Sequence, residues 1–259
     1  YYLIATGIKS IDSGAGVAPI VNEDEPFVMQ LNRGWNMIGN PYPTAVDWGG
    51  VIELNNNIAE LNVFNNSLRP SDTLPAYGGG FVFSENGGII TIPISALYAY
   101  DASGRRTKVL KDGKGWHANI SILNGNNNTL DLFFGVHPEA NTSKDGFDRM
   151  MPPNVLSGEE IYFYHPEYFW SKFAGDIVSL EENEKYIWPL TLKNHNVATL
   201  QLSWNIENMA NLDKVLFMHA PFMEQPVNMQ LESKYSINPN QRETTLYFYY
   251  GFEEEEVSA

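Results

Sequence analysis

The chain of 259 residues contains no cysteine, which excludes disulfide bonds, a thiolate nucleophile and a zinc site built on cysteine. A secreted protein of this length can still fold, because its core is large enough without cross-links. No apolar run approaches the roughly 20 residues that a membrane-spanning helix needs, so we expect no membrane insertion. A signal peptide is missing too, and the opening Tyr1-Tyr2-Leu3-Ile4 has the pattern of a strand interior. We therefore expect a piece of a longer, processed protein.

Positive charge is scarce. The chain has 16 Lys and Arg against 31 Asp and Glu, which gives a formal net charge of −15. Such a surface repels the phosphates of nucleic acids and anionic lipids, so we expect no nucleic-acid partner. The acidic excess is compatible with divalent cations, but solubility is the simpler interpretation.

The sequence motifs of several enzyme classes are also missing. There is no GxSxG nucleophile elbow, no GxGxxG and no P-loop pattern. The five histidines show no HExxH or HxH spacing of the kind that metal catalysis uses. The doublets Glu159-Glu160 and Glu181-Glu182 are not catalytic pairs in themselves, because neighbouring residues on a strand point to opposite faces. We predict that the chain is not an enzyme.

What is present favours β-structure. The chain is 43% hydrophobic and 13% aromatic, with 21 Gly and 15 Pro. Strand formers separated by turn signals every 8–12 residues or so predict an all-β fold with little helix. We expect two or three consecutive antiparallel β-sandwich units, Ig-like or jelly-roll-like. The first would span residues 1–97 and the second 98–252, with a further division near 153 or 183, and residues 253–259 would form a solvated acidic tail.

The stretch LNRGWNMIGNPYPTAVDW, residues 31–48, is the most distinctive part of the chain. Trp35 and Met37 alternate with Asn36 and Ile38, which predicts a short strand leading into a corner. Two prolines exclude helix just after it. We favour a packed β corner over a binding groove. The predicted corner residues are Trp35, Asn40, Pro41, Tyr42, Pro43 and Trp48.

These residues carry a family resemblance. GWNMIGNPYP with Asp47-Trp48, followed by GGGFVF at residues 78–83, resembles the "GWNLIGNPYP" modules of large surface proteins in Bacteroidetes, Ignavibacteria and their relatives, which use type IX secretion. The resemblance implies a β-sandwich module that precedes a C-terminal sorting domain at the cell surface. It implies an extracellular structural or adhesive role, with neighbouring domains or copies of the same protein as partners. Assembly into an array or filament is a sharper hypothesis, for which we expect residues 244–250 to offer an exposed edge strand. The chain stops about where the sorting domain would begin, so we expect that domain to be cleaved or left out.

Asp72-Thr73-Leu74 resembles the short O-glycosylation signal of Bacteroidetes, with Thr73 as the acceptor, and would make the protein a glycoprotein.

The sequence suggests two further binding sites without deciding between binding and a structural role. Residues 162–170, YFYHPEYFW, are unusually aromatic, and Tyr164, Tyr168 and Trp170 could contact sugars, because sugar rings stack on flat aromatic faces. Packing in the core is the favoured alternative. The alternative function is accordingly a carbohydrate-binding module or an accessory region of a secreted hydrolase.

The second open site is a metal site. Glu139, Asn141, Asp145 and Asp148 crowd one loop with the hard oxygen ligands that Ca²⁺ prefers. Their spacing lacks the alternation of an EF-hand loop, and capping of turns is the simpler role. No other cofactor is expected.

Overall fold

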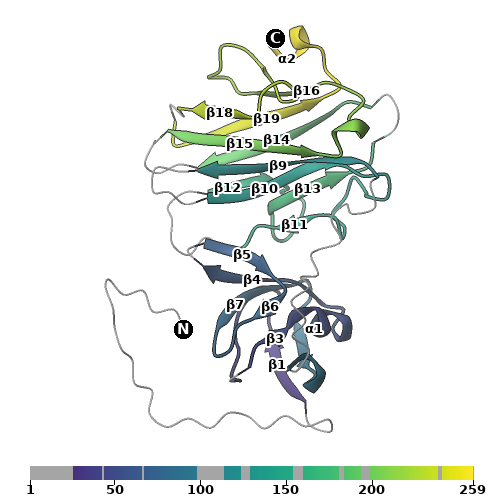
Figure 1. Cartoon of the computed structure of the whole chain (residues 1–259), viewed down its shortest axis with the longest axis vertical. Helices are drawn as coiled ribbons and strands as arrows, with labels where there is room; N and C mark the ends of the chain where they lie inside the picture. Colours follow the sequence, from purple (N-terminus) through teal and green to yellow (C-terminus); the bar gives the residue numbers. More distant parts are fainter. Residues whose placement is uncertain are drawn as a thin grey trace.

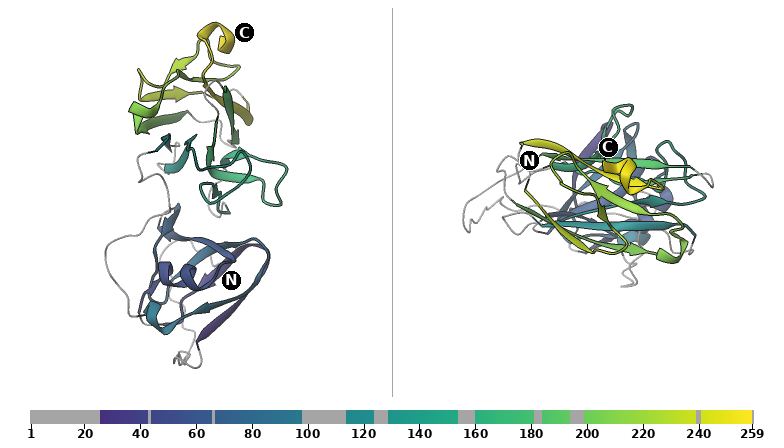
Figure 2. Two further views of the ribbon diagram at one scale, coloured as in Figure 1. Left: turned by 90° about the vertical axis from the view of Figure 1, so that its right-hand side faces the viewer. Right: turned by 90° about the horizontal axis from the view of Figure 1, so that it is seen from above.

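The computed structural model describes residues 26–42, 44–65, 67–97, 114–123, 129–153, 160–180, 184–193, 199–238 and 241–258. The fold is all-β, as predicted: most described residues lie in strands, and the two α-helices found among them are short. The strands form two units stacked along the long axis of the molecule (Figures 1 and 2).

The first unit is built of three small antiparallel sheets. Its elements are β1 (Phe27–Leu31), β2 (Gly34–Gly39), β3 (Val46–Asp47), α1 (Trp48–Leu54), β4 (Ile58–Asn65), β5 (Ser67–Ser71), β6 (Thr73–Leu74), β7 (Gly79–Ser84), β8 (Gly88–Ile92) and the 3-10 turn η1 (Ile94–Leu97). The largest sheet has the order β2-β7-β4-β5, while β1 pairs with β8 and β3 with β6. Trp48, Val51, Leu61 and Leu74 are fully buried at the centre of these sheets.

The second unit is one eleven-stranded sheet. Its elements are β9 (Trp116–Leu123), β10 (Thr129–Val136), β11 (Arg149–Met150), β12 (Glu160–Tyr164), β13 (Lys172–Val178), β14 (Tyr186–Lys193), β15 (Leu200–Glu207), the 3-10 turn η2 (Met209–Asn211), β16 (Leu216–His219), β17 (Val227–Asn228), β18 (Lys234–Ile237), β19 (Glu243–Tyr250) and α2 (Glu254–Ser258). The order is β17-β16-β19-β14-β12-β13-β10-β9-β15-β18, with β11 on β13. Of the strand pairs described, only β10 with β13 is parallel, and the sequence did not reveal this pair.

This sheet curls so that its two halves face each other across one core. The ring of Phe134 on β10 stacks on Phe248 of β19, with centroids 4.4 Å apart. Trp116 on β9 meets Trp188 of β14 at 6.0 Å and Tyr250 of β19 at 5.2 Å. Such aromatic contacts add to the area that these large side chains bury. Strand β15 alternates strictly between buried and exposed residues, as a strand with one face on a core must.

The short strand predicted before the corner is present as β2, which buries Ile38 and leaves Met37 43% exposed. Two other expectations were wrong in detail. Strand β19 is not an edge at Tyr247–Tyr250, where it pairs with β14 on one side and β16 on the other, while 244–246 pair with β14 alone. The acidic tail forms α2, whose Val257 is buried and whose Glu256 pairs with Lys185 at 2.6 Å, so it is not simply solvated.

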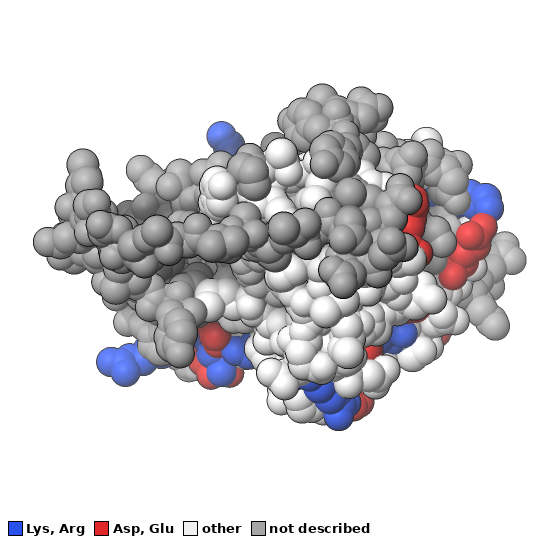
Figure 3. Space-filling model, turned by 90° about the horizontal axis from the view of Figure 1, so that it is seen from below, with Lys and Arg blue, Asp and Glu red and all other residues white. Residues whose placement is uncertain are grey.

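Charge is unevenly distributed. Figure 3 views the molecule from the end formed by the first unit: outside the grey atoms most of the visible surface is uncharged, and acidic and basic side chains gather in mixed groups toward its margin. In the coloured part of this view, the acidic excess of the chain is therefore not concentrated. None of the helices among the described residues is long and apolar enough to cross a membrane.

Candidate functional site

Three aromatic rings join the two units. Trp35 of β2 and Phe83 of β7 contact each other edge to face, with centroids 5.5 Å apart. Trp170, from the loop between β12 and β13, meets Trp35 at 6.4 Å and Phe83 at 6.5 Å. The indole Nε1 of Trp170 donates to the carbonyl of Met151 at 3.0 Å, which fixes the ring in place. These three residues are called the aromatic joint below.

Ion pairs surround the aromatic joint. Arg149 of β11 faces Glu60 of β4, with Nε and Oε1 3.8 Å apart, and both side chains are mostly buried. Burial raises the pKa of Glu60, and the charge of Arg149 opposes that rise. Burial likewise lowers the pKa of Arg149, against the opposing charges of Glu60 and Asp131. Lys144 pairs with Glu85, so cations of the second unit meet carboxylates of the first at two places.

A cleft of about 290 Å³ lies between the units. Aromatic rings line it, together with four carboxylates: Glu60, Glu85, Asp145 and Asp148. Glycoside hydrolysis uses a pair of carboxyl groups that converge on the substrate in a cleft. Here Glu60 and Glu85 face the cations Arg149 and Lys144, and the two aspartates accept backbone hydrogen bonds. Each carboxylate therefore has a charged or backbone partner in the structure, although the Oε1 of Glu60 faces Arg149 without a hydrogen bond.

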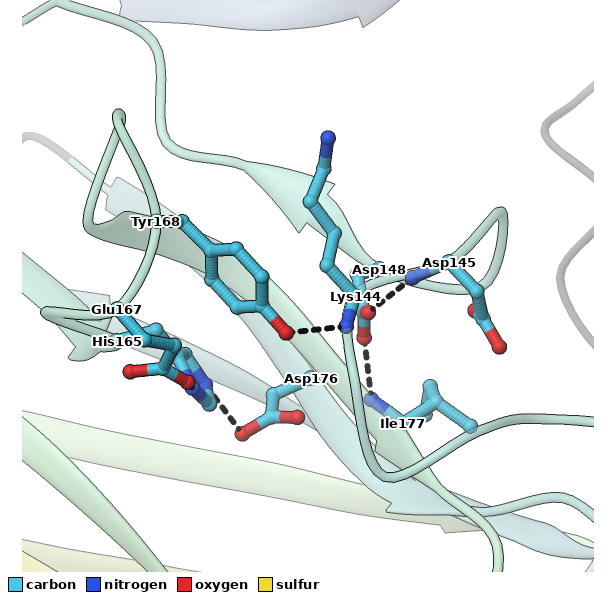
Figure 4. Close-up of polar contacts among 8 residues, drawn as sticks. All are labelled: Lys144, Asp145, Asp148, His165, Glu167, Tyr168, Asp176 and Ile177. Atoms are coloured by element: carbon cyan, nitrogen blue, oxygen red, sulfur yellow. Dashed lines mark hydrogen bonds and ion pairs between the residues drawn. The ribbon is translucent and has the colours of Figure 1, made fainter.

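The aspartates organise the loop between β10 and β11 (Figure 4). Asp145 accepts hydrogen bonds from the backbone N–H of Asn141 at 2.7 Å and of Phe147 at 2.7 Å. Asp148 accepts from the N–H of Asp145 at 2.9 Å and, across the sheet, from that of Ile177 at 3.0 Å. The loop thus needs these carboxylates to satisfy its own N–H groups, which is the turn-capping role.

The calcium hypothesis gains no support from this geometry. Glu139 turns to Lys114, at 2.5 Å, instead of joining Asn141, Asp145 and Asp148. Across the described ranges, no group of three or more His, Asp or Glu side chains is placed to hold a metal ion.

His165 forms a second polar cluster that sequence reasoning missed. Its Nε2 lies 3.0 Å from Asp176, a buried residue of β13, and its Nδ1 lies 3.1 Å from Glu167 (Figure 4). Burial disfavours the imidazolium, but hydrogen bonds and charge from Asp176 and Glu167 outweigh it and raise the pKa of His165. Of the two carboxylates, only Glu167 lies close to His165 in the sequence. Asp176 comes close because β12 pairs with β13.

Asp148 gives a prediction about pH. Burial raises its pKa from 3.8 to about 7; the N–H groups of Ile177 and Asp145 oppose the rise, and the charges of Asp176 and Asp145 add to it. The folded state then binds more protons than the unfolded state between these two values, so stability falls as pH rises through this window. Relative to the Asp148→Asn variant, the wild-type free energy of unfolding should decline from about pH 4 to about pH 7 and then level off.

Urea unfolding of both proteins across this range measures the difference. The amide of Asp148→Asn has one acceptor oxygen fewer for the backbone N–H groups. This loss shifts the variant's free energy of unfolding by the same amount at every pH. The signal is therefore the slope of the free energy of unfolding against pH. Parallel curves for the two proteins would show that Asp148 titrates as an ordinary carboxyl.

The three predicted sugar-contacting aromatics do not converge. Tyr164 is 48% exposed on the outer face of β12. The hydroxyl of Tyr168 accepts a hydrogen bond from the backbone N–H of Lys144 at 2.7 Å. Trp170 belongs to the aromatic joint. Tyr164 alone of the three is presented on an open sheet surface.

The predicted corner residues divide between two places. Asn40, Tyr42 and Trp48 are buried in the first unit, where the Nδ2 of Asn40 donates to the carbonyls of Thr44, Leu74 and Pro75. Pro41 is half-buried beside them, whereas Trp35 lies in the aromatic joint. Pro43 lies outside the described residues.

Thr73, the predicted glycan acceptor, is half-buried in β6 opposite Asp47, and its N–H donates to the hydroxyl of Ser71 at 3.2 Å. Its modification stays a prediction.

Comparisons with known proteins give no relative. The chain matches no family model, no curated protein and no solved structure.

Proposed function

We propose that the chain is a non-catalytic structural module, a stiff two-unit segment of a larger extracellular protein of the type IX-secreted kind. The aromatic joint carries this proposal. Trp35, Phe83 and Trp170 bury rings across the boundary between the units, and the pairs Arg149–Glu60 and Lys144–Glu85 fix their relative orientation. Domains that move relative to each other usually share small, polar interfaces, whereas this boundary contains packed aromatic rings.

The occupied acids of the cleft support the non-catalytic part. General acid–base catalysis needs a carboxyl that can reach a substrate proton. The carboxylates in the cleft instead face cations or accept backbone hydrogen bonds from their own loop and from β13. The partners that suit such a module are the neighbouring domains of its parent protein or further copies of it. The filament hypothesis loses part of the support first given to it, because β19 is internal to the sheet at Tyr247–Tyr250.

Small-angle X-ray scattering tests the stiffness. We expect one compact, elongated particle for the wild type, and for Trp170→Ala a larger radius of gyration with a broader distance distribution, because the ring that bridges the units is gone. Met209→Ala, an exposed change on η2, is the matched control and should scatter like the wild type. A Trp170→Ala profile that superimposes on the wild type would refute the stiff joint.

A further inference from the structure

The outer face of four adjacent strands in the second unit is covered with tyrosine. In the order β12-β14-β19-β16, alternate residues point inward to the core, among them Phe163, Leu190 and Phe248. The residues between them point outward. Strand register places Tyr247 between Pro189 and His219, and Tyr249 between Ile187 and Phe217. Tyr164 follows Phe163, the partner of Leu190, and therefore comes next to Pro189 on the same outer face. The outward-facing Tyr164, Ile187, Pro189, Tyr247 and Tyr249 are called the tyrosine face.

The tyrosine face is electrically neutral on a strongly acidic protein. Its rows contain aromatic, aliphatic and threonine side chains together with His219, and no carboxylate. Two carboxylates stand at its margin and are neutralised there: Glu160 pairs with Lys172 at 2.8 Å and Glu243 with Lys193 at 3.3 Å. A ligand on this face therefore meets neither a net charge nor strong repulsion.

The hydroxyls of the tyrosine face have no hydrogen-bond partner within the part of the chain that the structure describes. Among the described residues, the phenol oxygens of Tyr164, Tyr247 and Tyr249 make no hydrogen bond. The inward-facing Tyr250 of the same strand differs, because its hydroxyl bonds to Asp213. Free phenol groups can both donate and accept, so this surface offers flat rings with a hydrogen-bonding group at the end of each.

From this arrangement we propose that the tyrosine face binds a neutral saccharide chain. Sugar rings can lie against the tyrosine rings, while their hydroxyls bond to the phenol oxygens. Tyr164 and Tyr247 stand on strands separated by β14, which spaces them by about 10 Å, or two strand separations; the rings of Tyr247 and Tyr249 are 6.1 Å apart. Several sugar units of one chain can thus contact the exposed Tyr164 and the half-buried Tyr247 and Tyr249 at once.

The available hydroxyls favour a saccharide over a second copy of this chain. In two tyrosine faces packed together, the buried phenol groups would have only one another as partners, and each group that the fixed register leaves unpaired is costly. A saccharide has hydroxyls on every ring, which can turn to meet the phenol groups. This binding would be additional to the structural role, and neither depends on the other.

The test uses the full chain, a neutral glycan array and calorimetry with cellohexaose, xylohexaose and mannohexaose. We expect at least one neutral oligosaccharide to bind, and Tyr164→Ala, Tyr247→Ala and Tyr249→Ala each to weaken it about tenfold. Tyr247→Phe and Tyr249→Phe, which keep the ring and hence the fold, should weaken it less. Tyr77→Ala, at a tyrosine of the first unit that is 70% exposed, should bind like the wild type.

Three results would overturn the proposal. One is no binding to any neutral glycan. Another is binding that survives all three alanine changes. The third is a concentration-dependent dimer in sedimentation velocity that Tyr247→Ala abolishes, because it would assign the tyrosine face to a second copy of this chain.

Discussion

Replacing Asn40 with alanine should lower the free energy of unfolding by roughly 3–5 kcal/mol, because several buried hydrogen-bonding groups lose their partner at once. The side chain is 4% exposed. Its Nδ2 donates to the carbonyl oxygens of Thr44 at 2.8 Å, Pro75 at 2.9 Å and Leu74 at 3.3 Å, and its Oδ1 accepts from the N–H of Tyr42 at 2.9 Å. The amide of Asn40 therefore joins the end of β2 to the segment after β6. Alanine at this position removes its hydrogen bonds to three backbone carbonyls and one backbone N–H.

Urea unfolding followed by tryptophan fluorescence measures this change. Asn56→Ala is the matched control: Asn56 is exposed in the turn before β4, so its removal should change stability by no more than about 0.5 kcal/mol. A loss below about 1 kcal/mol for Asn40→Ala would mean that water replaces the amide at this corner.

The sequence was sufficient for features that depend on neighbouring residues. In residues 200–204 apolar and polar residues alternate along the sequence, and β15 buries the apolar ones, Leu200, Leu202 and Trp204. The composition of strand and turn formers predicted the all-β class. These predictions hold because the side-chain period of two is a property of a strand itself.

Features that depend on which strands become neighbours could not be predicted from the sequence. The pattern of Thr244–Tyr250 shows a strand but not whether it is an edge, since that is decided by β14 and β16 packing beside it. On β2, Trp35, Met37 and Ile38 are all apolar, so the pattern could not decide which face meets the core. Tertiary packing settled it, placing Ile38 inward and Trp35 at the joint with the second unit.

The candidate site was unpredictable for the same reason. Its key pair, Glu60 with Arg149, joins strands of different units, and no local spacing announces such a contact. The aromatic richness of residues 162–170 was visible, but their roles differ because a strand and the loop after it point side chains in several directions. Tyr164 faces outward from β12, while Trp170 turns to the first unit.

Gly135→Ala should be more damaging still, with a loss of more than about 4 kcal/mol or a failure to fold. A Cβ at this position would lie 2.2 Å from the carbonyl oxygen of Trp116 and 2.6 Å from the Cα of His117. Both are backbone atoms of β9, which pairs with β10 at this point. Strand β10 cannot move away, because β13 holds its other side through the parallel pair. Relief of the clash therefore requires separating strands in the middle of the sheet.

Gly146→Ala is the control that isolates this effect. A Cβ there meets nothing within 4 Å, so the same chemical change should be neutral, or stabilising by about 0.4–1 kcal/mol through the lower entropy of the unfolded chain. Thermal unfolding by circular dichroism and urea titration of both variants measures the contrast. If the two variants unfold within about 1 kcal/mol of each other, the close approach of β9 and β10 is not a constraint on this fold. A large gap would show that the close approach of β9 to Gly135 limits this position of β10 to glycine.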